Sequence, residues 1–118
     1  MKYAGICAAP DGRLYCAPAT ASTVSVINLE TQSLTLIAGA GDGLCKYFGI
    51  CAGPDGCLYC APFNASTVLV IDPGTQTLSF IAGAGKESMK CCGICAGPDG
   101  RLFCAPSHAS TVLVIDPT

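Results

Sequence analysis

The segment Gly49–Asp72 reads GICAGPDGCLYCAPFNASTVLVID, and it occurs three times in the chain. The first copy starts at Gly5 as GICAAPDGRLYCAPATASTVSVIN and the third at Gly93 as GICAGPDGRLFCAPSHASTVLVID, so the period is 44 residues. A repeated unit of this length does not usually bury its apolar faces alone and needs neighbouring copies packed against it. The repeat therefore predicts an array of similar units.

The composition narrows the classes of partner and location. Of the 118 residues, 51% are hydrophobic and 12% are charged, so much of each unit's surface must be covered. Apolar strings such as Val68–Ile71 are far shorter than the roughly 18 residues that a membrane helix needs. A net charge of -2 without a basic patch argues against nucleic acid and membrane partners. The start, MKYAGICAAP, lacks the apolar segment of a secretory signal, which favours a cytoplasmic location.

Each repeat divides into short predicted strands. In the second copy, Tyr47–Gly53 and the strand ending at Ala61 flank Pro54-Asp55-Gly56, which is typical of a hairpin whose Gly takes a positive φ. Ser66–Ile71 is rich in β-branched residues, and Thr77–Ala82 alternates apolar and polar residues as an outer strand does. The equivalent predicted strands are Tyr3–Ala9, Arg13–Ala17, Ser22–Ile27 and Ser33–Ala38 in the first copy, and Cys91–Gly97, Arg101–Ala105 and Ser110–Ile115 in the third.

Four antiparallel strands in a period of about 40 to 45 residues indicate a β-propeller blade. GPDGxLYCAP followed by STVLVIDPxTQTL resembles the YVTN/NHL-type blade family, with Tyr59-Cys60-Ala61-Pro62 where the Tyr-Val-Thr-Asn motif would lie. The predicted fold is all-β. Its blades cover residues 2–45, 46–89 and 90–118, and the third lacks its outer strand.

Three blades do not close a ring, because propellers typically have four to eight. We therefore expect chains to associate head to tail, with a homodimer of six blades favoured and a trimer as the alternative. A fragment of a longer chain and an engineered repeat module also fit the sequence. The last possibility gains support from copies two and three, which agree at 22 of 29 aligned positions.

The chain has 10 cysteines, six of them at repeated positions. The hairpin register places Cys51 beside Tyr59 and Cys60 beside Ile50, on opposite faces of the blade, which argues against a disulfide within a blade. The favoured interpretation is that these cysteines are small buried hydrophobes. Cys57 to Cys60 and Cys92 to Cys95 are CxxC strings, but zinc and redox sites place CxxC on turns or helix starts. We expect no metal and no cofactor.

Differences between the copies gather in two loops, the one after the second strand and the connector to the next copy. Both are predicted at the end of the blade opposite the Pro-Asp-Gly turns. Loops at one end of a rigid scaffold are the usual place for binding. The candidate ligand-binding residues are Phe63, Asn64, Ser107, His108, Lys86 and Glu87.

No Ser-His-Asp set or paired carboxylates occur, so no catalytic residue is assigned. The sequence favours a noncatalytic, self-assembling propeller scaffold that binds a protein or a small ligand on the variable-loop face or in the central channel. The alternative is an enzyme or metal-binding propeller whose channel site, built from residues such as Cys51, Cys95 or His108, forms only after assembly.

Overall fold

A computed structural model describes residues 1–117, which form eleven strands in three antiparallel sheets. Within each sheet the strands pair in the order of the chain. The sheets are β1 (Tyr3–Ala8), β2 (Leu14–Pro18), β3 (Thr23–Asn28) and β4 (Ser33–Ala38); β5 (Tyr47–Ala52), β6 (Leu58–Pro62), β7 (Thr67–Asp72) and β8 (Thr77–Ala82); and β9 (Cys91–Ala96), β10 (Leu102–Pro106) and β11 (Leu113–Ile115).

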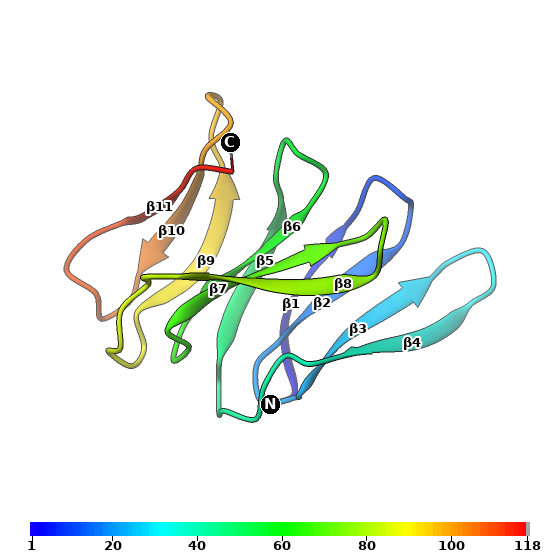
Figure 1. The fold of residues 1–118 in the computed structure, drawn as a ribbon, viewed down its shortest axis with the longest axis horizontal. Coiled ribbons are helices and arrows are strands. Elements are labelled where there is room, and N and C mark those ends of the chain that lie inside the picture. Colours follow the sequence, from blue (N-terminus) through cyan, green and yellow to red (C-terminus); the bar gives the residue numbers. More distant parts are fainter. Residues whose placement is uncertain (118) are drawn as a thin grey trace.

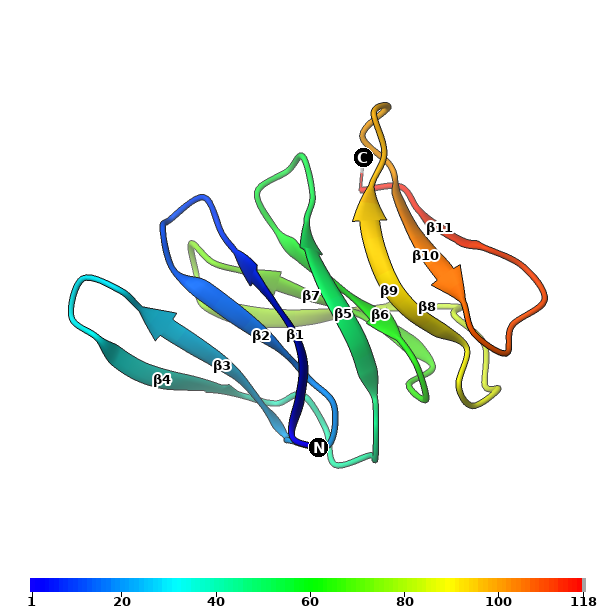
Figure 2. The same ribbon diagram turned by 180° about the vertical axis from the view of Figure 1, so that it is seen from behind.

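The three sheets stand next to one another in chain order (Figure 1). Their first strands, β1, β5 and β9, lie side by side, and the later strands of each sheet extend away from them (Figure 2). We call the sheets blade 1, blade 2 and blade 3. None of the described residues forms a helix that is long and apolar enough to cross a membrane.

The Pro-Asp-Gly hairpins form as predicted. Gly12, Gly56 and Gly100 have φ values of 84°, 85° and 87°, the positive region that favours glycine. The Gly53 amide donates to the Cys57 carbonyl at 2.8 Å, which closes the hairpin of blade 2. The predicted register is also confirmed, because Cys51 pairs with Tyr59 and Ile50 pairs with Cys60.

Blade 3 departs from the predicted strand limits. Its third strand, predicted over Ser110–Ile115, extends only over Leu113–Ile115. In blade 2 the residues equivalent to Thr111 and Val112 are held in β7 by pairing with β8, through Thr67 with Ala82 and Val68 with Ile81. Among residues 1–117 blade 3 has no fourth strand to provide this pairing, so β11 is shorter.

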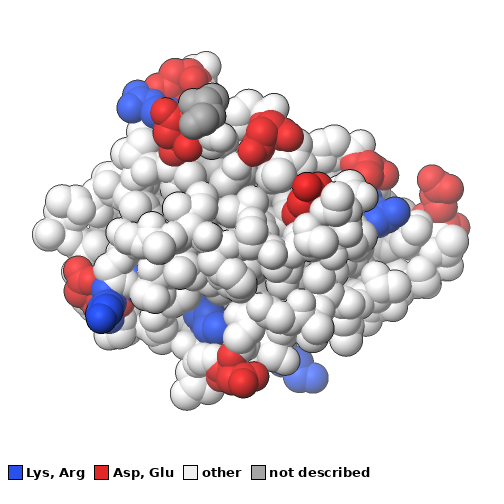
Figure 3. All heavy atoms as spheres, in the orientation of Figure 1, with Lys and Arg blue, Asp and Glu red and all other residues white. Residues whose placement is uncertain are grey.

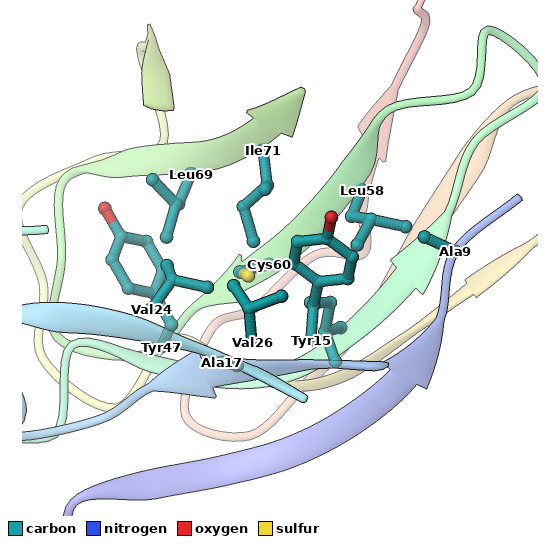
Figure 4. Close-up of a cluster of buried hydrophobic side chains, with 11 residues drawn as sticks. Ala9, Tyr15, Ala17, Val24, Val26, Tyr47, Leu58, Cys60, Leu69 and Ile71 are labelled. Atoms are coloured by element: carbon teal, nitrogen blue, oxygen red, sulfur yellow. The ribbon is translucent and has the colours of Figure 1, made fainter. Parts of the chain in front are cut away.

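The core lies between the blades and not within any one of them. Between blades 1 and 2, Tyr15, Val24 and Val26 of blade 1 cluster with side chains from one face of blade 2 (Figure 4), which are Tyr47, Ile50, Leu58, Cys60, Leu69 and Ile71. A second cluster joins Tyr59, Ala61 and Val68 of blade 2 to Cys91, Leu102, Cys104 and Ile115 of blade 3. Blade 2 therefore packs one face against blade 1 and the other face against blade 3.

Two outward faces remain uncovered within the chain. On blade 1, Ile6 is 56% exposed, whereas its equivalent in blade 2, Ile50, is 9% exposed. On blade 3, Val112 is 52% exposed, whereas its equivalent in blade 1, Val24, is 0% exposed. We name these surfaces the blade-1 end face (Tyr3, Ile6, Leu14, Cys16, Ile27, Leu34 and Leu36) and the blade-3 end face (Phe103, Ala105, Val112 and Val114).

The outer strand of blade 1, β4, is more exposed than its sequence predicts, because within residues 1–117 no blade packs on the side of blade 1 that faces away from blade 2. The alternation in Ser33–Ala38 predicts one buried apolar side, yet Leu34 and Leu36 are both exposed. Leu78, the blade 2 equivalent of Leu34, packs against the cluster between blades 1 and 2, whereas Phe80, the equivalent of Leu36, is itself 48% exposed. The apolar side of β4 thus faces away from blade 2, where no blade covers it.

Candidate functional site

The variable loops and the connectors meet at one end of the blades. Asn64, in the loop after β6, bridges the connectors on both sides of blade 2. Its side-chain Nδ2 donates to the Leu44 carbonyl at 3.1 Å, and its Oδ1 accepts from the Met89 amide at 2.8 Å. The predicted clustering of the two loop types is therefore present, but the polar groups of Asn64 are already engaged in holding the loops together.

Phe63 has a structural contact as well. Its ring stacks on that of Phe48 in β5, with centroids 4.3 Å apart and planes inclined by 17°. The side chain is half-buried. The stack fixes the loop against the inner strand of its own blade and leaves only part of the ring for a ligand.

The remaining candidates are exposed on the loops. Ser107 and His108 follow β10, and the His108 backbone amide donates to the Met89 carbonyl at 2.8 Å. Lys86 and Glu87 lie in the connector before blade 3. Within residues 1–117, the four side chains form no hydrogen bond or ion pair with one another. The structure thus gathers the loops without assembling these side chains into one constellation.

Sequence reasoning missed the two lysines beneath these loops. Lys46 is buried, and its Nζ donates to the carbonyls of Ala21 at 2.7 Å, Ala19 at 3.0 Å and Gly43 at 3.2 Å. Burial lowers the pKa of this ammonium, and Asp42 partly offsets the effect. Lys90 repeats the arrangement with the carbonyls of Glu87 at 2.7 Å and Phe63 at 3.4 Å, and burial lowers its pKa too. The 44-residue recurrence of lysine at positions 2, 46 and 90 is the signal that could have found them.

All ten cysteines are free thiols, of which three are buried, five are partly buried and two are exposed. Cys60, Cys91 and Cys104 are buried, and desolvation raises the pKa of each, that of Cys104 to about 12. A thiol whose pKa is raised is a poor nucleophile and metal ligand, since both roles require the thiolate. Cys92 and Cys95 are exposed on β9. Among the described residues, no three His, Cys, Asp or Glu side chains are placed to hold a metal ion.

Grooves follow the junctions between blades on the loop side. A groove of about 500 Å³ runs between blades 1 and 2, where Lys46 and Asn64 lie among the connector residues. A smaller one of about 200 Å³ lies between blades 2 and 3, where Glu87 and Lys90 contribute polar atoms. Most of the charged side chains lie toward the rim of the view in Figure 3. These grooves are lined mainly by small and neutral residues.

We compared the sequence with protein families and curated proteins, and the structure with solved structures. No family model and no curated protein matches the sequence. Among solved structures, the chain is similar to virginiamycin B lyase from Staphylococcus aureus, with a TM-score of 0.72 and 16% identity over 99% of this chain. It is also similar to hydrazine synthase from Kuenenia stuttgartiensis, with a TM-score of 0.73 and 23% identity over 98% of this chain. The chain is built of β-propeller blades.

The likeness concerns only part of each larger propeller structure. The chain spans 42% of the virginiamycin B lyase chain and 33% of the hydrazine synthase chain. Streptogramin B lyase gives the same result, with a TM-score of 0.70, 16% identity and 40% of that chain covered. At these identities the likeness describes the propeller fold, and a propeller fold supports many unrelated activities.

Proposed function

We propose that the chain is a noncatalytic propeller scaffold that assembles with further copies of itself, blade 3 of one copy packing on blade 1 of the next. The observation that carries this proposal is the pair of end faces. They are the two unlike halves of an interface that the chain already forms twice internally, between blades 1 and 2 and between blades 2 and 3.

Residue-by-residue equivalence supports the match. Phe103, Ala105, Val112 and Val114 on the blade-3 end face correspond to Tyr15, Ala17, Val24 and Val26, which are all buried against blade 2. Ile6, Leu14, Cys16 and Ile27 on the blade-1 end face correspond to Ile50, Leu58, Cys60 and Ile71, which are all buried against blade 1. When one apolar end face docks on the other, the apolar surface of both is removed from water. This burial is the main driving force of most protein association.

The two faces differ, so the contact is head to tail, and such contacts form rings when the rotation closes. Two copies would bring six blades together, within the typical range of four to eight, whereas three copies would bring nine. The favoured assembly is therefore a homodimer. We further propose that it presents its variable-loop face, with Phe63, Asn64, Ser107, His108, Lys86 and Glu87, to a protein or small-molecule ligand.

The mass of the protein in solution tests the proposal. We expect light scattering and native mass spectrometry to give about twice the mass of the 11.9 kDa chain. Val112→Lys, on the blade-3 end face, should shift the protein to a folded monomer. Leu44→Lys is the matched control, because Leu44 is also exposed and apolar but lies in the connector between blades 1 and 2. A well-folded monomer for the parent chain at high concentration would overturn the scaffold proposal.

A further inference from the structure

Each internal junction between blades contains the same lysine clamp. The backbone amide of Lys46 donates to the Ala19 carbonyl at 2.8 Å, and that of Lys90 donates to the Phe63 carbonyl at 2.8 Å. The Nζ of each lysine reaches back to the same carbonyl, and that of Lys46 also reaches Ala21 two residues later. One lysine thus ties its own blade to the loop of the preceding blade through both backbone and side chain.

Lys2 occupies the equivalent position in blade 1, and its backbone already has the clamp arrangement. Its carbonyl accepts from the amides of Ala19 at 2.8 Å and Ala21 at 3.2 Å. The Lys46 carbonyl accepts in the same way from Phe63 and Ala65, and the Lys90 carbonyl from Ser107 and Ala109. Among residues 1–117, the Lys2 amide and ammonium, which would face a preceding blade, have no hydrogen-bond partner, and the Lys2 side chain is exposed.

The complementary acceptors are at the other end of the chain. Ser107 and Ala109 of blade 3 correspond to Ala19 and Ala21 of blade 1, whose carbonyls receive Lys46. Within the part of the chain that the structure describes, the Ser107 and Ala109 carbonyls accept no hydrogen bond outside the strands, and the Lys2 amide and ammonium donate none. Among residues 1–117, Lys2 of blade 1 thus has unpaired donors, and Ser107 and Ala109 of blade 3 have unpaired acceptors, at the positions equivalent to the paired groups of the internal clamps.

We propose that Lys2 of one copy latches onto the Ser107 and Ala109 carbonyls of a second copy, with its amide donating to Ser107 and its ammonium to both. This inference rests on the proposed self-assembly and adds the polar contact that sets its register. Apolar faces alone tolerate sliding, whereas an ammonium inserted among carbonyl oxygens is satisfied in one position only, since an unpaired buried charge is costly. The latch selects the head-to-tail pairing that continues the internal spacing of the blades.

Amine acylation followed by mass spectrometry tests the latch directly. In the assembled protein we expect the Lys2 ammonium to be protected from an acylating reagent, and dilution below the dissociation constant should expose it. Lys86 provides an internal control because it is exposed in the connector and should react at every concentration. Lys46 and Lys90 are buried within the chain and should stay protected in the folded protein.

A substitution separates the latch from the assembly itself. Lys2→Met keeps the aliphatic stem and removes the charge, and we expect the Kd of association to rise by about ten- to hundredfold, because hydrogen bonds from a charged donor are stronger than neutral ones. Lys86→Met should leave the Kd of association between chains unchanged, because Lys86 lies in the connector before blade 3. Circular dichroism of both variants checks that the fold persists. If the parent chain assembles but Lys2 stays reactive and Lys2→Met binds equally well, the latch is wrong and the scaffold stands. A parent chain that remains monomeric overturns both.

Discussion

The side-chain Nε2 of Gln76 donates a hydrogen bond of 2.7 Å to the Tyr15 hydroxyl, which joins the outer turn of blade 2 to the second strand of blade 1. Tyr15 in turn donates to the Asp11 Oδ2 at 2.9 Å, beside the Pro-Asp-Gly turn. Gln76 has a φ of 57°, and its equivalent in blade 1, Gln32, has a φ of 52°, so Gln32 is held in the same turn conformation. In the proposed assembly Gln32 would face Phe103, the residue of blade 3 that corresponds to Tyr15 and lacks its hydroxyl.

Phe103→Tyr should therefore tighten the association of chains. The new hydroxyl would gain Gln32 of the neighbouring copy as a donor and Asp99 of its own turn as an acceptor. A net contribution of about 1 kcal/mol for one hydrogen bond corresponds to roughly a fivefold decrease in Kd. Analytical ultracentrifugation measures the change. Tyr15→Phe is the internal counterpart and should lower the free energy of unfolding by about 1 kcal/mol for each of its two hydrogen bonds, those with Gln76 and Asp11. An unchanged Kd for Phe103→Tyr would place Gln32 away from the junction.

The sequence predicts the repeated parts of this fold well because local chemistry specifies them. The Pro-Asp-Gly turn sets the hairpin register, and Ser33–Ala38 and Thr77–Ala82 match β4 and β8 in full. The shortening of β11 and the exposure of Leu34 could not be read from composition, since both depend on whether a neighbouring strand or blade is present.

The candidate site was harder to predict than the fold. Differences between copies pointed to Asn64, yet its amide spans two connectors and holds their backbone groups. Lys46 looks like an ordinary surface lysine in the sequence and is in fact buried among carbonyls. Its role follows from the approach of two loops that are distant in the sequence, and only the recurrence of lysine at the repeat period hints at it.

Gly93→Ala should block assembly while leaving the single chain folded. A Cβ on Gly5 would lie 3.0 Å from the Gly49 Cα, and one on Gly49 would lie 2.9 Å from the Gly93 Cα, so the inner strands approach too closely for a side chain. A Cβ on Gly93 meets nothing within 4 Å in the chain, but it would meet Gly5 of the next copy if the internal spacing continues.

Gly39→Ala is the matched control for that substitution. Gly39 has a φ of 104° and open space around its Cβ position, and Gly93 has a φ of 102°, so both variants carry similar backbone strain of order 1–3 kcal/mol. Thermal unfolding at concentrations below the Kd of the parent should show similar losses for the two variants, whereas light scattering above that Kd should show a monomer for Gly93→Ala only. Assembly of Gly93→Ala at the parent Kd would contradict continued packing of the inner strands.

A fourth strand added to blade 3 should lengthen β11. Appending TQTLSFIA, the sequence of residues 75–82, after Thr118 would supply the partner that β8 gives to β7. We expect slower hydrogen exchange at Val112 and Val114 and a higher Tm, because paired backbone groups no longer face solvent. A tail of the same composition in shuffled order is the control, and equal protection by both tails would show that the added strand does not pair.

Alkaline pH should destabilise the protein through its buried thiols. Desolvation raises the pKa of Cys60, which is fully buried, so the folded state keeps this proton while the unfolded chain loses it above about pH 9. Stability then falls as pH rises, by about 1.4 kcal/mol per pH unit for each thiol that ionises only on unfolding. Lys46 and Lys90 oppose this trend because burial lowers the pKa of each ammonium. The thiols outnumber them, since burial raises the pKa of Cys7, Cys16, Cys51, Cys57, Cys60, Cys91 and Cys104.

Urea unfolding under reducing conditions between pH 7 and 10.5 measures this dependence. Cys60→Ala should lower stability at pH 7, since it leaves a cavity between blades 1 and 2, yet its stability should fall less steeply with pH than that of the parent. Cys92→Ala, at an exposed position on β9, should follow the parent curve. Parallel curves for the parent and Cys60→Ala would mean that Cys60 ionises as readily in the folded chain as in the unfolded one, and so that water reaches the core between the blades.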